Sequence, residues 1–255
     1  MLIFALESSA KAASVAITRD GALIGEQFLN VGLTHSQTLM PMTQALFAQT
    51  GLTPADMDFF AVAVGPGSFT GVRIGVSQTK GMAMAANRPC IPVSSLEAMC
   101  FSFCPASGAI ICPVMDARCG QVYNALFEAK DGVFLRLCED RAIAVDELCG
   151  ELAERKKQMI TKHNHSAFVL VGDGAQPMFA RCGLREGSNS AFRIPYSELK
   201  PLLAPPSVRF QRASGVALAA ESAPLKAVTA AELVPVYLRL PQAERELRAK
   251  TAKES

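Results

Sequence analysis

The chain has 255 residues, of which 50% are hydrophobic and 19% charged, and its formal net charge is +2 at pH 7. This composition is typical of a globular protein and excludes a disordered or collagen-like chain. The charge is too small to predict nucleic-acid binding, and no apolar run approaches the roughly 20 residues that cross a bilayer. We therefore expect no membrane-spanning segment, and we do not expect this chain to hold RNA on its own.

The first apolar segment, residues 2–7, reads LIFALE and is expected to be a buried strand. No basic region precedes it and Glu7 interrupts it early, so it does not resemble a signal peptide. The 8 cysteines have irregular spacing without a C-x-x-C pair. They are expected to be free thiols, and the reducing cytoplasm is the expected compartment.

Three strands are predicted within residues 2–30. The first ends at Glu7, and Asp20-Gly21 separates the second from the third. An Asp-Gly pair between apolar runs is typical of a hairpin, because glycine adopts positive φ without strain. The pattern then predicts a helix at about 35–50, a strand at 59–64, a helix at about 70–87 and a short strand near 90–93.

Residues 109–138 repeat this order, with a strand that ends at Asp116, a turn at Gly120 and a second Asp-Gly pair at Asp131. The pattern then predicts a helix at about 144–162, a strand at 167–172, a loop or short helix near 175–182, a strand near 191–194 and a helix near 207–222. Loose strand assignment could produce such a similarity by chance. We favour an internal duplication of β-β-β-α-β-α-β-α units, in which helices cover mixed sheets.

The glycine-rich segment between the first-half strand and helix is the most specific feature of the sequence. It reads GPGSFTGVRIG at residues 65–75. Ser68 or Thr70 can cap the helix, and a loop of this kind can hold a phosphate. It lacks the lysine of a Walker A loop, and a tight structural turn is the stronger interpretation.

This segment resembles the signature of the TsaB (YeaZ) family. Three other segments resemble motifs of the same family: THSQTLMPMTQALF at 34–47, MDARCGQVYNALF at 115–127 and PVYLR at 235–239. The resemblance therefore includes both halves of the chain and its C-terminal part.

The duplicated plan resembles the two-domain α/β fold of actin, Hsp70 and sugar kinases, in which two domains face each other across a nucleotide cleft. We expect a first domain of residues 1–104 plus about 206–232, a second domain of residues 105–205 and a C-terminal extension of residues 233–255. A strand or turn that docks on the domains, followed by a solvated tail, is the expected form of that extension.

One position departs from the family pattern. Glu7-Ser8 stands where the family usually has Asp-Thr, and in active relatives of the fold this acidic residue orients Mg²⁺ or water. Glu7 and Ser8 are therefore weak candidates for a cofactor site. Gly172 and Gly174 are equally weak, because glycine turns end many strands. No tightly bound cofactor is expected.

The sequence argues against catalysis by this chain alone. The catalytic paralogue TsaD carries a Val-Asn-His-Leu-Glu-Gly-His segment, whose two histidines lie on one helix face and can bind one metal. The corresponding residues 93–99 read VSSLEAM, with Ser95 and Met99 at the histidine positions. We therefore predict no metal site there. His163 and His165 are interpreted as residues of a solvated loop, and no G-x-S-x-G motif is present.

The two helices of the first domain are the expected partner surface. Leu39, Met42 and Leu46 form one stripe of the first helix. A broad core face is the alternative interpretation of this stripe. The family resemblance implies pairing with TsaD through these helices, and the residues named for this interface are His35, Leu39, Met42, Leu46, Val72, Arg73 and Val76.

The resemblance implies a non-catalytic subunit that activates a TsaD-like catalytic chain in N6-threonylcarbamoylation of adenosine 37 of tRNAs that read ANN codons. A TsaE-type ATPase is the further expected partner, with ATP or ADP at the complex interface. A homodimer is expected when the partner is absent, and tRNA contacts are expected only through the complex. The alternative is an independent enzyme of the actin-like class, either glycoprotease-like or an ATPase.

Overall fold

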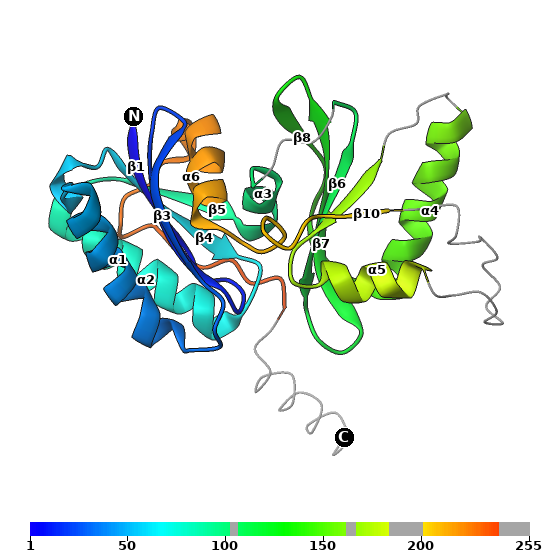
Figure 1. Ribbon diagram of the computed structural model, residues 1–255, viewed down its shortest axis with the longest axis horizontal. Helices are drawn as coiled ribbons and strands as arrows, with labels where there is room; N and C mark the ends of the chain where they lie inside the picture. The colour runs from blue at the N-terminus through cyan, green and yellow to red at the C-terminus, as the bar shows by residue number, and fades with distance from the viewer. Residues whose placement is uncertain (103–106, 162–166, 184–200, 240–255) are drawn as a thin grey trace, which may run out of the picture.

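The computed structural model describes residues 1–102, 107–161, 167–183 and 201–239, which form two domains side by side (Figure 1). The elements of the first half are β1 (Leu2–Glu7), β2 (Ala13–Arg19), β3 (Ala22–Leu29), α1 (His35–Thr50), β4 (Phe59–Gly65), α2 (Phe69–Ala86), β5 (Cys90–Ser94) and α3 (Ser95–Cys100). Those of the second half are β6 (Ile110–Asp116), β7 (Gln121–Lys130), β8 (Val133–Ala144), α4 (Val145–Thr161), β9 (Phe168–Val171), α5 (Ala175–Gly183), β10 (Leu202–Leu203) and α6 (Ala213–Ser222).

The two sheets have the same topology. The first has the order β3-β2-β1-β4-β5, and the second, read from its other edge, has the order β8-β7-β6-β9-β10. In each sheet two antiparallel hairpins are followed by parallel strands. The predicted internal duplication is confirmed, and with it the two-domain fold of the actin and sugar-kinase type.

Both predicted Asp-Gly hairpins are present. Asp20 and Gly21 have φ of 50° and 75°, and Asp131 and Gly132 have φ of 50° and 82°. Two consecutive left-handed residues match the twist of the flanking strands. The strand expected near 191–194 lies outside the described residues, and β10 takes the fifth position of the second sheet, beside β9.

The central strands of each sheet are covered on both faces, whereas the edge strands β3 and β8 are partly exposed. The outer faces are covered by α1 and α2 in the first domain and by α4 and α5 in the second, while α3 and α6 lie between the domains (Figure 1). Helix α6 comes from the end of the chain but packs on the first sheet through small side chains such as Ala213, Ala217 and Ala220. A Cβ at Gly215 would lie 2.3 Å from the Ala98 carbonyl oxygen, so α6 approaches α3 closely.

Helix α3 connects the two cores. Its Leu96, Met99 and Cys100 are fully buried against the second sheet, whereas Ala98 packs with the first. Among the described residues, every helix is too short or too polar to span a membrane.

Candidate functional site

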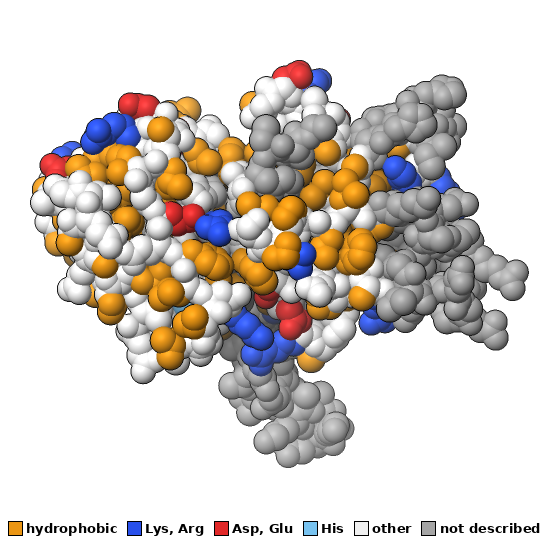
Figure 2. Space-filling model, viewed as in Figure 1, with side chains coloured by type: hydrophobic (Ala, Val, Ile, Leu, Met, Phe, Trp, Pro, Cys, Tyr) orange, Lys and Arg blue, Asp and Glu red, His pale blue; other side chains and the backbone are white. Residues whose placement is uncertain are grey.

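The space between the domains holds two adjoining cavities of about 580 and 630 Å³. The loops that follow β1, β4, β6 and β9 line the first cavity, and Lys11, Asp116 and Asp173 line both. Figure 2 shows acidic and basic side chains together at the lower edge of the boundary between the two halves. The walls therefore offer carboxylate and cationic groups to a polar ligand.

Glu7 ends β1 next to this space and is fully buried. One carboxylate oxygen accepts the backbone N–H of Ser9 at 2.5 Å. The other, Oε2, has no hydrogen-bond partner among the described residues. Burial, with a smaller contribution from the charge of Asp173, raises the pKa of Glu7 to about 7. At neutral pH this carboxyl is therefore partly protonated and is poorly suited to act as a fixed anion.

The signature glycines make room for the loop after β1. Cβ atoms placed at Gly67 and Gly71 would lie 2.2 Å from the carbonyl oxygens of Ser9 and Ser8 respectively. The Ser8 hydroxyl donates to the Gly71 carbonyl at 2.9 Å, and Ser68 N–H donates to the Ser9 carbonyl at 2.6 Å. The protein's own loop thus occupies the approach to the N-terminus of α2, as the structural interpretation of this segment expects.

The glycines of the second half have a similar packing role. Gly172 has φ of 108°, and a Cβ there would lie 2.2 Å from the Val114 carbonyl oxygen. Gly174 packs on Val114 and on the backbone of Asp116, and it lines the larger cavity. Of the four weak cofactor candidates, Gly174 alone is among the residues that line these cavities. Glu7 and Ser8 directly precede the loop of residues 9–12, which lines both cavities.

Helix α3 carries the residues that stand where TsaD has its histidines. Ser95 and Met99 are both fully buried, and Met99 belongs to the core of the second domain. The Ser95 hydroxyl has no hydrogen-bond partner among the described residues. Within the described part of the chain, no three His, Cys, Asp or Glu side chains are grouped to hold a metal ion. His163 and His165 lie outside the described residues.

Five residues predicted for the partner interface belong instead to the core of the first domain, and this part of the prediction is corrected. Their side chains are at most 4% exposed and pack between α1, α2 and the first sheet. The physical reason is that the apolar stripe of each helix covers the sheet, which for the first helix is the broad core face given as the alternative. The residues are Leu39, Met42, Leu46, Val72 and Val76.

The other two predicted interface residues lie nearer the surface. His35 is half-buried, and its Nε2 lies 2.8 Å from the Ala10 carbonyl oxygen, so it holds the loop after β1. Arg73 is exposed on α2, where its guanidinium stacks 3.8 Å above the Phe69 ring and its Nε donates to the Tyr237 hydroxyl at 2.8 Å. Both residues thus have intramolecular contacts.

A different face of the two helices is open. Met40 of α1 is 43% exposed and Met84 of α2 is 67% exposed. Ser77, Gly81 and Ala85 are also exposed on α2 and follow a spacing of four residues. A Cβ at Gly81 would meet nothing within 4 Å, so the fold itself does not require glycine there. We call the exposed residues Met40, Ser77, Gly81, Met84 and Ala85 the open helix face.

Comparison with known proteins places the chain among its relatives. The family model described as TsaD, tRNA N6-adenosine threonylcarbamoyltransferase, matches residues 30–246. The Bacillus subtilis tRNA threonylcarbamoyladenosine biosynthesis protein TsaB is 32% identical over 160 residues, which are 63% of this chain and 69% of that protein. The Escherichia coli protein of the same name is 33% identical over 177 residues, which are 69% and 73% of the two chains. The chain belongs to the TsaB family.

A solved structure agrees at the level of the fold. The structure described as YeaZ from Pseudomonas aeruginosa superposes with a TM-score of 0.70 at 23% identity, covering 93% of this chain and 99% of that one. The sequence relatives confirm the predicted membership of the TsaB (YeaZ) family, and this structure confirms the fold. The TsaB family belongs to tRNA threonylcarbamoyladenosine biosynthesis, and the match to the TsaD family model relates it to a transferase family.

Sequence reasoning missed part of the site. The last described residues of this TsaB-family chain, Val236 to Arg239, form one wall of the 580 Å³ cavity. Two prolines and mixed charges predicted a docked strand or turn followed by a solvated tail, but they did not indicate that this segment lines a cavity. The family resemblance of PVYLR was the further sequence signal. Contacts between residues more than 100 positions apart, such as Arg73 with Tyr237, have no local pattern.

Proposed function

We propose that this chain is a non-catalytic partner subunit that docks on a TsaD-type catalytic chain in the N6-threonylcarbamoylation of adenosine 37 of tRNAs that read ANN codons. Membership of the TsaB family supports the pathway. The observation that carries the docking role is the open helix face, where Gly81 has no packing role in its own domain. A glycine inside a helix costs roughly 0.5–1 kcal/mol relative to alanine, and the close approach of a second backbone would offset that cost.

The non-catalytic role is supported by α3. Two histidines spaced like Ser95 and Met99 could bind one metal ion, whereas a buried hydroxyl and a thioether are poor ligands for a hard or borderline ion. Met99 also packs in a dry core, which leaves its sulfur no access to a substrate. In this proposal the catalytic metal and the substrates are held by the partner chain, and tRNA contacts this chain only within the complex.

The remaining parts of the proposal concern the assembly. A TsaE-type ATPase is the further partner, ATP or ADP binds at the complex interface, and the same open helix face forms a homodimer when the partner is absent. The cytoplasm is the proposed compartment. A stable interface of this kind buries on the order of 1,600 Å² in total.

The proposal is tested by reconstitution. TsaD, a TsaE-type ATPase, the low-molecular-weight synthase, threonine, bicarbonate, ATP and tRNA are combined with and without this chain, and modified adenosine is measured by mass spectrometry. Modification is expected only when the chain is present. Equal modification without it contradicts the proposal.

The interdomain cavities favour a second candidate, an independent actin-like-fold ATPase, because their walls combine Lys11, Arg118 and Arg239 with two aspartates. The isolated chain distinguishes the two candidates. Sustained ATP hydrolysis by the purified chain, abolished by an Asp173→Asn substitution, supports the second candidate and opposes the first.

A further inference from the structure

We propose that residues 234–239 form an interdomain strap that crosses the mouth of the cleft, ties the two domains together through Arg239 and covers the 580 Å³ cavity. This inference rests on the contacts of the chain itself and does not depend on the proposed function.

The strap is anchored to the first domain at its start. Leu233, the residue before it, is 1% exposed and belongs to the first core. Lys80 of α2 donates to the carbonyl oxygens of Ala231 and Leu233, both at 3.1 Å. Val236 N–H then donates to the Val64 carbonyl at the end of β4, at 2.7 Å. The entry of the strap is therefore held by side-chain packing and by three hydrogen bonds.

Gly65 of the family signature is explained by this anchor. Its φ is 119°, and a Cβ there would lie 2.4 Å from the carbonyl oxygen of Val236. Any side chain at this position would push the strap away from β4. A signature residue and a residue of the C-terminal PVYLR segment are thus complementary in shape.

The middle of the strap lies on the first turn of α2. The Tyr237 and Phe69 rings have centroids 4.5 Å apart, and the Arg73 guanidinium covers the Phe69 ring. The hydrogen bond from Arg73 to the Tyr237 hydroxyl fixes the direction of the ring. Aromatic pairs of this kind contribute beyond their buried area, so the strap has a defined position here.

Arg239 makes the crossing to the second domain. Its Nη1 donates to the carbonyl oxygens of Ala117 and Arg118, in the turn between β6 and β7. Hydrogen bonds from a guanidinium are charge-assisted and stronger than neutral ones. Residues 236–239 line the cavity together with loops of both domains, so the strap closes one side of it.

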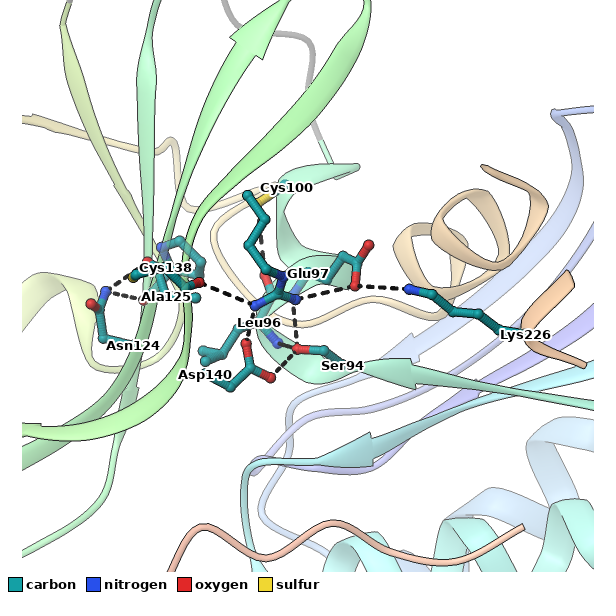
Figure 3. A network of polar contacts seen from close by, with 11 residues as sticks. Ser94, Leu96, Glu97, Cys100, Asn124, Ala125, Cys138, Asp140 and Lys226 are labelled. Carbon is teal, nitrogen blue, oxygen red and sulfur yellow. Dashed lines mark hydrogen bonds and ion pairs between the residues drawn. The ribbon is translucent and has the colours of Figure 1, made fainter. Parts of the chain in front are cut away.

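A second tie lies at the bridge between the domains, centred on α3 (Figure 3). Ser94 caps α3 and donates to Asp140 of β8 at 2.5 Å. Arg136 of β8 contacts Asp140 at 2.5 Å and Glu97 of α3 at 3.2 Å. Domains that are tied at the bridge can still rotate about it and open the cleft. A tie at the mouth prevents that rotation, which is the action we assign to the strap.

The test compares the full chain with an Arg239→Ala variant by hydrogen–deuterium exchange. Arg88→Ala is the matched control, because Arg88 also donates to a carbonyl, that of Ala55, but within one domain. Arg239→Ala is expected to speed exchange at least about tenfold in peptides of the β6–β7 turn and of the strap, because the variant loses the charge-assisted hydrogen bonds to the Ala117 and Arg118 carbonyls. Arg88→Ala is expected to leave both regions unchanged, and circular dichroism confirms that both variants are folded.

Access to the cavity is measured on the same proteins. Tyr123 lines the cavity and is half-buried, so its nitration by tetranitromethane, mapped by mass spectrometry, reports opening. Severalfold faster nitration of Tyr123 in Arg239→Ala than in the wild type and in Arg88→Ala supports the strap. Unchanged exchange in the turn or unchanged nitration of Tyr123 overturns it. Because both measurements use the isolated chain, they are independent of partner docking.

Discussion

Gly75 of α2 lies directly against Ser8, since a Cβ at Gly75 would be 2.2 Å from the Ser8 hydroxyl oxygen and 2.8 Å from the Leu6 side chain. Gly81 lies about 1.7 turns further along the same helix, and a Cβ there would meet nothing within 4 Å. Packing within the domain therefore requires glycine at position 75 but not at position 81. Alanine substitutions at the two positions distinguish these cases.

Gly75→Ala is expected to destabilise the chain by about 1–3 kcal/mol, because the added methyl overpacks a buried contact. Gly81→Ala is expected to stabilise it by about 0.5–1 kcal/mol, since alanine is the better helix former at an exposed position. Urea unfolding of both variants measures the difference. Equal effects of the two substitutions would refute the packing role of Gly75.

Buried and exposed methionines of α1 and α2 test the corrected interface. Met42 is 4% exposed, so Met42→Arg buries an unpaired charge and is expected to unfold the domain. Met40→Arg and Met84→Arg are expected to leave the fold intact and to weaken pairing with a TsaD-type chain at least tenfold. Leu225→Arg, at a fully exposed position between α6 and the strap, is the control. Gel filtration measures pairing and circular dichroism measures folding, and normal pairing by both exposed-face variants would exclude the open helix face as the docking surface.

The raised pKa of Glu7 predicts a pH-dependent stability. The pKa of this carboxyl is about 4.5 in the unfolded chain and about 7 in the folded chain, so the folded state binds the proton more tightly. Stability from this group is therefore present below pH 4.5 and is lost as pH rises to about 7. Glu7→Gln is expected to be more stable than the wild type at pH 8, by at most about 3 kcal/mol, and to match it below pH 4.5.

Urea unfolding at pH 4.5 and pH 8 measures this effect. Glu139→Gln, at an exposed position of β8, controls for the loss of one negative charge. A wild type that gains stability from pH 4.5 to 8 relative to Glu7→Gln contradicts the assignment.

Because the carboxyl has no role in catalysis in the proposed function, Glu7→Ala is expected to change tRNA modification little in the reconstituted system, provided the chain remains folded.

The bridge network of Figure 3 predicts a larger role for Arg136 than for a surface arginine. Arg136 contacts two carboxylates and covers the Phe127 ring at 4.7 Å, and Arg136→Ala is expected to cost about 1–2 kcal/mol. Arg155 forms an i,i+4 pair with Glu151 on α4, and Arg155→Ala is expected to cost less than about 1 kcal/mol. Thermal unfolding of the two variants measures the difference, and an equal loss would show that the bridge contributes no more than a surface pair.

Local patterns in the sequence were sufficient for the elements and their duplication. The helix over 35–50 and the two Asp-Gly hairpins follow from side-chain periodicity and from the φ preference of glycine, both of which act over a few residues. The matching order of the two halves then predicted the paired sheets. The family motifs predicted the correct family, and their residues make structural contacts in this chain, such as Gly65 against Val236 and Arg73 with Tyr237.

Tertiary structure alone decided which face of each helix is free. Leu39 and Met40 are adjacent and both apolar, yet one lies in the core and the other in solvent, because the position of the sheet selects the face that is buried. The tertiary structure also decided that residues 234–239 contact both domains. The fold brings together residues that are far apart in the chain, namely Arg73 with Tyr237 and Arg239 with Ala117. Helical periodicity specifies which residues share a face, but only the packing of the elements determines what that face contacts.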